Sequence, residues 1–180
     1  MKNIAKLIIS IAICELAGAA GSVFTTPAIG TWYAGLAKPS FNPPNWIFGP
    51  VWIILFFLMG ISLYLVWSRQ WVVKNALMPT KRKIWNSVSE RFWSGSWQKQ
   101  NVIAVFAVQL ILNVLWSAIF FGLKSPGAAF FELLTLWCAI VYTIVNFYRV
   151  SKAAAWLLSP YILWVSFAAI LNFALWRMNY

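Results

Sequence analysis

The sequence predicts an all-α integral membrane protein, a bundle of five transmembrane helices. Of its 180 residues, 62% are hydrophobic and only 9% are charged, whereas soluble domains carry about 25% charged residues. A helix needs ~20 apolar residues to cross the hydrocarbon core of a bilayer. Runs of this size occur five times, over residues 4–24, 44–67, 102–122, 127–148 and 153–177. We therefore expect one membrane domain over residues 1–180.

The first run, 4–24, is interpreted as a span rather than as a cleaved signal peptide. Basic residues precede it and small residues lie near its end, as in a signal peptide. Glu15, however, interrupts the apolar segment. Ala17 and Gly21 have the small-xxx-small spacing with which helices approach closely, either within the bundle or between two chains. This spacing is one ground for expecting a homodimer.

Prolines refine the last two runs. Ser125 followed by Pro126 has the pattern of a helix N-cap and first turn, so the fourth helix is expected to begin there. Pro160 lies inside the fifth run, and a proline inside a helix removes a backbone donor. We therefore expect a kink near Pro160.

Residues 69–100 form the only long polar segment of the sequence. This segment contains seven lysines and arginines but only one acidic residue, Glu90, and four tryptophans lie among them. Basic residues mixed with aromatics also occur in nucleic-acid interfaces. Between two spans, contact with anionic lipid at the membrane surface is the preferred interpretation, with the tryptophans at headgroup level. We predict membrane lipids, and no nucleic acid, as partners of this segment.

The stretch 32–52 is rich in proline and in large aromatic residues and carries one charge, Lys38. Prolines fix φ, and aromatic rings offer flat apolar area. The first part of the stretch is interpreted as a folded cover that leads into the second helix. It either helps to bind a ligand or bridges two helices at the interface.

Three helices carry residues at helical spacing that suit a common cavity. Trp52 and Phe56 lie one turn apart in the second run, as do Trp164 and Ala168 in the fifth. Asn113 belongs to a polar stripe in the third run, which must face the bundle interior because polar groups in hydrocarbon are costly. The same residues also suit plain core packing.

The composition limits the chemistry. The chain has no histidine, and its two cysteines, Cys14 and Cys138, have no metal-binding spacing and are interpreted as buried thiols. No metal and no cofactor are predicted. Glu15 and Glu132 belong to different helices, so paired acid–base work depends on a separation that the sequence does not fix. A neutral aromatic pocket remains, which suits a flat apolar ligand whose acidic substituents Lys38 or Arg177 could meet.

Residues 32–52 follow the pattern W-Y-x-x-L-x-K-P-x-[FW]-x-P-P-x-W-x-x-x-P-V-W, which resembles the first loop and second helix of the TspO/MBR, or translocator protein, family. Asn113-x-x-Trp116 followed by Phe120-Phe121-Gly122 resembles the third helix of that family. Pro160-Tyr161, Trp164, Phe167-Ala168 and Leu171-Asn172 resemble its fifth helix. One departure is Phe173, which stands where the cholesterol motif of vertebrate members has tyrosine.

The resemblance implies ligands: tetrapyrroles such as protoporphyrin IX, and isoquinoline or benzodiazepine-type drugs. It also implies a homodimer and three functions: a porphyrin-binding protein or sensor, a porphyrin or sterol transporter, or a porphyrin-degrading enzyme. In the last case Trp52 and Trp164 would be the catalytic residues by motif position. The predicted ligand-binding residues are Trp32, Tyr33, Pro43, Trp46, Trp52, Phe56, Asn113, Trp116, Ser117, Phe120, Trp164, Ala168 and Leu171.

The distribution of lysine and arginine predicts the orientation. With five spans, one side of the membrane receives 11 of the 14 cations: Lys2 and Lys6 at the start of the first span, the seven in 69–100, and the two in the short 149–152 connection. The other side receives three, Lys38, Lys124 and Arg177. The positive-inside rule therefore places the N-terminus and the basic segment in the cytoplasm, and the C-terminus on the opposite side.

This topology is tested by single cysteines at Ser40 and Lys83 in a variant without the native cysteines. A membrane-impermeant maleimide added to sealed cells should label the Ser40→Cys variant, and should label Lys83→Cys only after the membrane is opened. Labelling of both from the same side would contradict the five-span topology.

Overall fold

A computed structural model describes residues 2–69 and 95–180 of the chain. The segments, in chain order, are α1 (Lys2–Ile29), the 3-10 turn η1 (Tyr33–Gly35), α2 (Asn45–Ser68), α4 (Gly95–Ser117), the π-helical turn η4 (Ala118–Gly122), α5 (Pro126–Val150), α6 (Lys152–Leu157) and α7 (Ser159–Asn179). Within these residues five spans are long and apolar enough to cross a membrane. The predicted fold class is confirmed. Residues 70–94, most of the predicted basic segment, lie outside the described residues.

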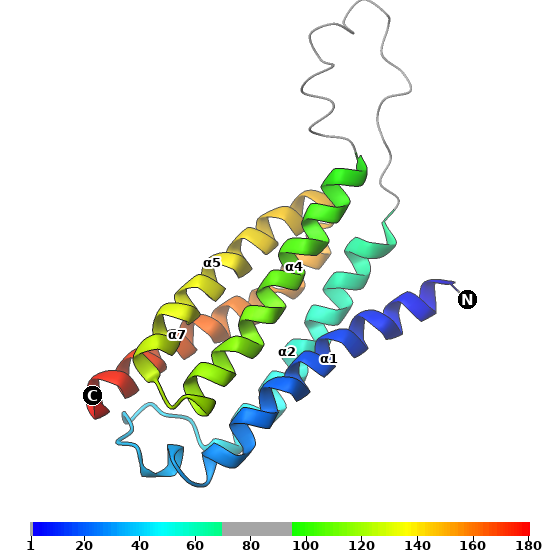
Figure 1. Cartoon of the computed structure of the whole chain (residues 1–180). Helices are drawn as coiled ribbons and strands as arrows, with labels where there is room; N and C mark the ends of the chain where they lie inside the picture. Colours follow the sequence, from blue (N-terminus) through cyan, green and yellow to red (C-terminus); the bar gives the residue numbers. More distant parts are fainter. Residues whose placement is uncertain (1, 70–94) are drawn as a thin grey trace, which may run out of the picture.

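The helices lie lengthwise in one bundle (Figure 1), and their contacts close into a ring. α1 packs beside α2 and α4, α4 beside α5, and α5 beside α6 and α7. α6 closes the ring against α2, where the Ser62 hydroxyl donates a hydrogen bond to the Ala154 carbonyl at 2.7 Å. Figure 1 shows the N-terminus at one end of the bundle, and the C-terminus with the 30–44 connection at the other. We call the second end the loop end.

Helix bounds differ from the prediction at two places. α1 continues past Pro27 to Ile29 instead of ending at residue 24. At this end the Thr31 hydroxyl donates to the Pro27 carbonyl at 2.8 Å, which supplies a donor that the end of the helix lacks, and within the helix the Thr25 hydroxyl donates to the Gly21 carbonyl at 3.2 Å. α4 begins at Gly95, inside the segment expected to be a polar loop.

The two proline signals correspond to real helix boundaries. Ser125 occupies the N-cap position of α5, with Pro126 in the first turn; its carbonyl, rather than its hydroxyl, accepts the N–H of Ala129 at 3.0 Å. The kink expected near Pro160 is a full break at Leu158, between α6 and α7. Pro160 has no N–H to donate to the preceding turn, so the chain starts a new helix there.

α1 and α2 approach most closely through glycine. A Cβ atom on Gly60 would lie 2.6 Å from the Cα of Ile11, and one on Gly18 would lie 2.6 Å from the Phe56 ring. Gly21 in turn faces Ser117, 3.1 Å from its hydroxyl oxygen. The glycines of the small-residue pairs therefore pack within the bundle, which leaves the homodimer without support from them.

The two cysteines differ in their exposure. Cys14 is buried in the core, as expected, whereas Cys138 is exposed on α5. The interpretation of Cys138 as a buried thiol is wrong. The reason is the heptad-like burial of α5, which turns Leu133, Leu136 and Ile140 inward and leaves Cys138 on the outer face.

Gly60→Ala should lower the free energy of unfolding by roughly 1–3 kcal/mol, because the new methyl group meets helix backbone that cannot move aside easily. Gly49→Ala in the same helix is the matched control, since nothing lies within 4 Å of its Cβ position. It should be neutral, or stabilising by up to about 1 kcal/mol through helix propensity. Denaturant unfolding in detergent measures both, and equal effects would contradict the proposed contact.

Candidate functional site

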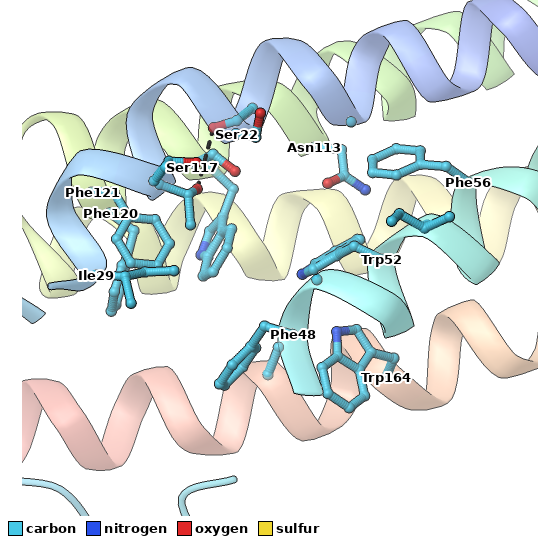
Figure 2. Close-up of a pocket in the computed structure, with 18 of the residues that line it drawn as sticks. Ser22, Ile29, Phe48, Trp52, Phe56, Asn113, Ser117, Phe120, Phe121 and Trp164 are labelled. Atoms are coloured by element: carbon cyan, nitrogen blue, oxygen red, sulfur yellow. Dashed lines mark hydrogen bonds between the residues drawn. The ribbon is translucent and has the colours of Figure 1, made fainter. Parts of the chain in front are cut away.

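A cavity of about 400 Å³ lies near the loop end, enclosed by α1, α2, α4, η4 and α7, with η1 at its edge. Ligand pockets commonly have volumes of ~300–1,000 Å³ with mostly apolar walls. Rings and aliphatic groups dominate this wall as well. Figure 2 shows Phe48 next to Trp164, Trp52 on the same side of the space, and Asn113, Ser117 and Ser22 across the space from them. The cavity has the size and the lining of a small-molecule site.

Ten of the thirteen predicted ligand-binding residues line this cavity. They are Tyr33, Trp52, Phe56, Asn113, Trp116, Ser117, Phe120, Trp164, Ala168 and Leu171. They come from five elements, η1, α2, α4, η4 and α7, and the residues predicted from helical spacing on α2, α4 and α7 all face the cavity. Their contact with a ligand stays a prediction.

Trp32, Pro43 and Trp46 do not line the cavity. Trp32 packs behind it, with its ring edge-on to Phe120 at a centroid distance of 5.6 Å. Pro43 lies in the connection, where its carbonyl accepts a hydrogen bond from Asn42. Trp46, in the first turn of α2, is 74% exposed. Around the axis of α2, Trp46 lies more than a quarter of a turn from both Phe48 and Trp52, which line the wall. Its ring therefore points out of the bundle.

The lining also includes residues that the sequence did not suggest. α1 contributes Gly18, Ala19, Ser22 and Thr25, and α2 contributes Phe48. The small residues of α1 did carry a signal, but it was assigned to contacts between helices. Small side chains can equally leave space between them, and the sequence does not separate the two cases.

The π-helical turn η4 supplies two adjacent cavity residues. The Leu123 N–H donates to the Ala118 carbonyl at 2.9 Å, five residues back. This wider turn brings both Phe120 and Phe121 to the wall, with ring centroids 4.8 Å apart and both near Tyr33. π turns are rare, and they concentrate at functional sites.

Aromatic rings on α2 and α7 form much of the wall. Trp52 stacks on Phe56 at 5.6 Å, with its edge toward Tyr161 at 6.4 Å. Phe48 meets Trp164 edge-on at 6.0 Å. These contacts bridge α2 and α7, so the large rings fix the width of the cavity at that point. The resulting surface suits a flat apolar molecule.

The polar groups near the cavity bind mainly to the protein. Asn113 donates to the Tyr161 hydroxyl at 2.5 Å, and Asn172 donates to the Pro126 carbonyl at 3.2 Å. The indole N–H groups of Trp116 and Trp164 are buried and have no partner among the described residues. The amides therefore fix helices, and the wall that a ligand would meet is largely neutral.

The two membrane carboxyl groups do not share the site. Glu15 lines the cavity from α1, whereas Glu132 on α5 is absent from the lining. Both carboxyl oxygens of Glu132 are buried without a hydrogen-bond partner among the described residues. Acid–base work needs both groups within reach of one reacting bond, so this arrangement gives no support to a paired-carboxylate mechanism.

The 30–44 connection closes the loop end through specific polar contacts. The Tyr33 hydroxyl donates to Asn42 at 2.8 Å. Burial raises the pKa of Tyr33, so this hydroxyl keeps its proton at neutral pH and remains a donor. The Lys38 ammonium binds the Ala34 and Leu36 carbonyls and lies 4.9 Å from the Tyr33 ring. Lys38 therefore stabilises the connection and does not line the cavity.

The end of α7 fastens the same connection. The Asn179 side chain accepts the Ala37 N–H at 2.8 Å and donates to the Ala37 carbonyl at 2.9 Å. It also donates to the Leu175 carbonyl of its own helix at 2.8 Å. One side-chain amide thus joins the cover to the helix that forms part of the cavity wall.

The fold and the cavity together define a multi-pass integral membrane protein with an aromatic cavity inside its helix bundle. The TspO/MBR family model matches residues 10–177, and the chain belongs to this family. It is 42% identical to the "Tryptophan-rich protein TspO" of Archaeoglobus fulgidus over 98% of this chain and 99% of that one. It is 37% identical to the human "Translocator protein" over 83% of this chain and 75% of that protein. The "Tryptophan-rich sensory protein" of Cereibacter sphaeroides is 30% identical, over 90% and 87% of the two chains.

Proposed function

We propose that this protein binds a tetrapyrrole of the protoporphyrin IX type in the aromatic cavity and acts as a membrane sensor for it. Isoquinoline and benzodiazepine-type compounds are expected to occupy the same space. The observation that carries the proposal is the wall of flat rings from α2, η4 and α7 around one cavity of about 400 Å³. The proposed sensory role comes from the name of the relative in Cereibacter sphaeroides, "Tryptophan-rich sensory protein".

The driving force for binding is the burial of ligand rings against aromatic side chains. Each Å² of apolar surface removed from water contributes about 25 cal/mol. A ligand that comes from water and buries roughly 400 Å² would gain about 10 kcal/mol, part of it already on entering the bilayer, and the loss of its translational and rotational freedom is subtracted from this gain. Acidic substituents are expected to point toward Lys38 and Arg177 at the loop end, because the described lining residues include no lysine or arginine.

We also propose that the N-terminus and residues 69–100 are cytoplasmic, that the basic segment contacts anionic lipid, and that the chain forms a homodimer. The orientation rests on the lysine and arginine distribution. The lipid contact rests on the charge of that segment.

Ala168→Phe should lower the affinity for protoporphyrin IX ten- to a hundredfold. Ala168 lines the cavity, and a ring there fills space that the ligand needs, an overpacking cost of roughly 1–3 kcal/mol. Ile170→Phe is the control on the same helix, because Ile170 is exposed and absent from the lining. Quenching of tryptophan fluorescence in a titration measures both. Wild-type affinity in a folded Ala168→Phe variant would remove the cavity as the binding site.

The alternative function is light-driven porphyrin degradation, and one observation favours it. Trp52 and Trp164, the candidate catalytic residues, both line the cavity (Figure 2). Trp164→Phe should keep most of the binding, since a ring remains, and should abolish any loss of porphyrin absorbance under illumination. Unchanged degradation would exclude Trp164 from this chemistry and leave the binding function in place.

A further inference from the structure

The exposed part of the cavity lining lies on two helices only. Six lining residues are exposed: Ala19, Ser22 and Thr26 on α1, and Asn45, Gly49 and Ile53 on α2. The lining residues of α4, η4, α7 and η1 are all buried or half-buried. The cavity is therefore open on its side, between α1 and α2.

The composition of these two helix faces keeps this side open. The exposed α1 residues recur three and four positions apart, and the α2 residues four apart, so each set forms one helix face. Most of their side chains are small, and nothing lies within 4 Å of a Cβ atom placed on Gly49. Farther from the loop end, Gly18 meets the Phe56 ring and closes the gap. The result is a slot bounded at its inner end by Phe56.

The slot faces hydrocarbon rather than water. α2 begins its span at Asn45, and Ile53 lies eight residues farther along, about 12 Å deeper at 1.5 Å per residue. The hydrocarbon core is ~30 Å thick, so the slot extends from the membrane boundary toward its middle. Large apolar side chains beside it are exposed, among them Leu16 and Val23 on α1 and Ile54 on α2.

The loop end, by contrast, is closed. Tyr33 is 4% exposed over the cavity, and its hydroxyl is bound to Asn42. Asn179 holds Ala37 by hydrogen bonds in both directions. A ligand arriving from water would have to break these contacts, whereas a ligand dissolved in the bilayer meets an existing opening.

We propose that flat apolar ligands enter this cavity sideways from the bilayer, through the slot between α1 and α2. The proposal rests on the proposed function, because it concerns the route by which a ligand of that cavity arrives. The substrate class is thereby narrowed to molecules that partition into hydrocarbon. The closed connection acts as a fixed cover, and α1 and α2 form the gate.

The test compares two glycines that both have open space around the Cβ position. Gly49→Phe places a ring at the slot, and Gly35→Phe places the same ring on the outer connection. Each protein is reconstituted in phosphatidylcholine vesicles, and the quenching of tryptophan fluorescence by protoporphyrin IX is followed by stopped flow. Gly49→Phe should slow association and dissociation about tenfold each. Gly35→Phe, and Asn179→Ala, which frees the cover, should keep the wild-type rates.

Two results would overturn the side entry. One is wild-type association in Gly49→Phe together with faster association in Asn179→Ala, which assigns the route to the loop end. The other is faster dissociation alone in Gly49→Phe, which means that the new ring occupies the cavity and does not gate it. Absence of saturable quenching in the wild-type protein would instead overturn the proposed porphyrin binding.

The route can also be measured without porphyrin. Ser117→Cys, in a variant with Cys14→Ala and Cys138→Ala, places one thiol inside the cavity. N-phenylmaleimide, a flat apolar reagent dissolved in the vesicle membrane, should label it, and the added Gly49→Phe change should slow labelling about tenfold. Equal labelling rates with and without Gly49→Phe would overturn the side entry, whatever the natural ligand is.

Discussion

The contact between α1 and α2 at Gly60 constrains the rest of this bundle. The missing side chain lets the backbone of α1 at Ile11 approach α2 closely, and two positions along α2 the Ser62 hydroxyl binds the α6 carbonyl of Ala154. Three helices are thereby fixed at the end of the bundle away from the loop. Helices in a bilayer gain little from hydrophobic burial against one another, so such close packing and interhelical hydrogen bonds carry much of the association.

Toward the loop end, aromatic rings separate α2 from α7. There the distance between α2 and α7 is filled by the rings of Phe48, Trp52 and Trp164. Rings leave flat gaps between them more readily than branched aliphatic chains do, and the cavity occupies such a gap. The break at Leu158 and the π turn at Ala118–Gly122 contribute to this geometry, since each departs from regular α-helix on an element that borders the cavity or carries its wall.

The proposed functions, binding with sensing or degradation, would all use this one cavity, and they differ in what would happen after a ligand is held. The lining of the cavity is mostly apolar. Asn113 donates to the Tyr161 hydroxyl, and Asn172 donates to the Pro126 carbonyl, so ring stacking would be the main source of affinity for the proposed ligand. A site of this kind discriminates by shape and flatness more than by hydrogen-bond pattern. That property is consistent with a family whose members are named both for tryptophan content and for sensing.

The sequence by itself determined the class of the protein, its five spans and most of the cavity faces. Hydropathy fixes spans because the bilayer leaves few alternatives to a helix. Helical periodicity fixes faces, which is why Trp52 with Phe56, and Trp164 with Ala168, were paired correctly. Only the tertiary structure decided that Trp46 points away from the bundle, that Phe121 joins Phe120 at the wall, and that α1 opens one side of the cavity. The direction of the Trp46 side chain depends on where α2 begins, and the direction of the Phe121 side chain depends on the wider π-helical turn η4. The open side depends on whether small residues in α1 draw a neighbour in or leave a gap beside it, and that is settled by the packing of helices far apart in the chain.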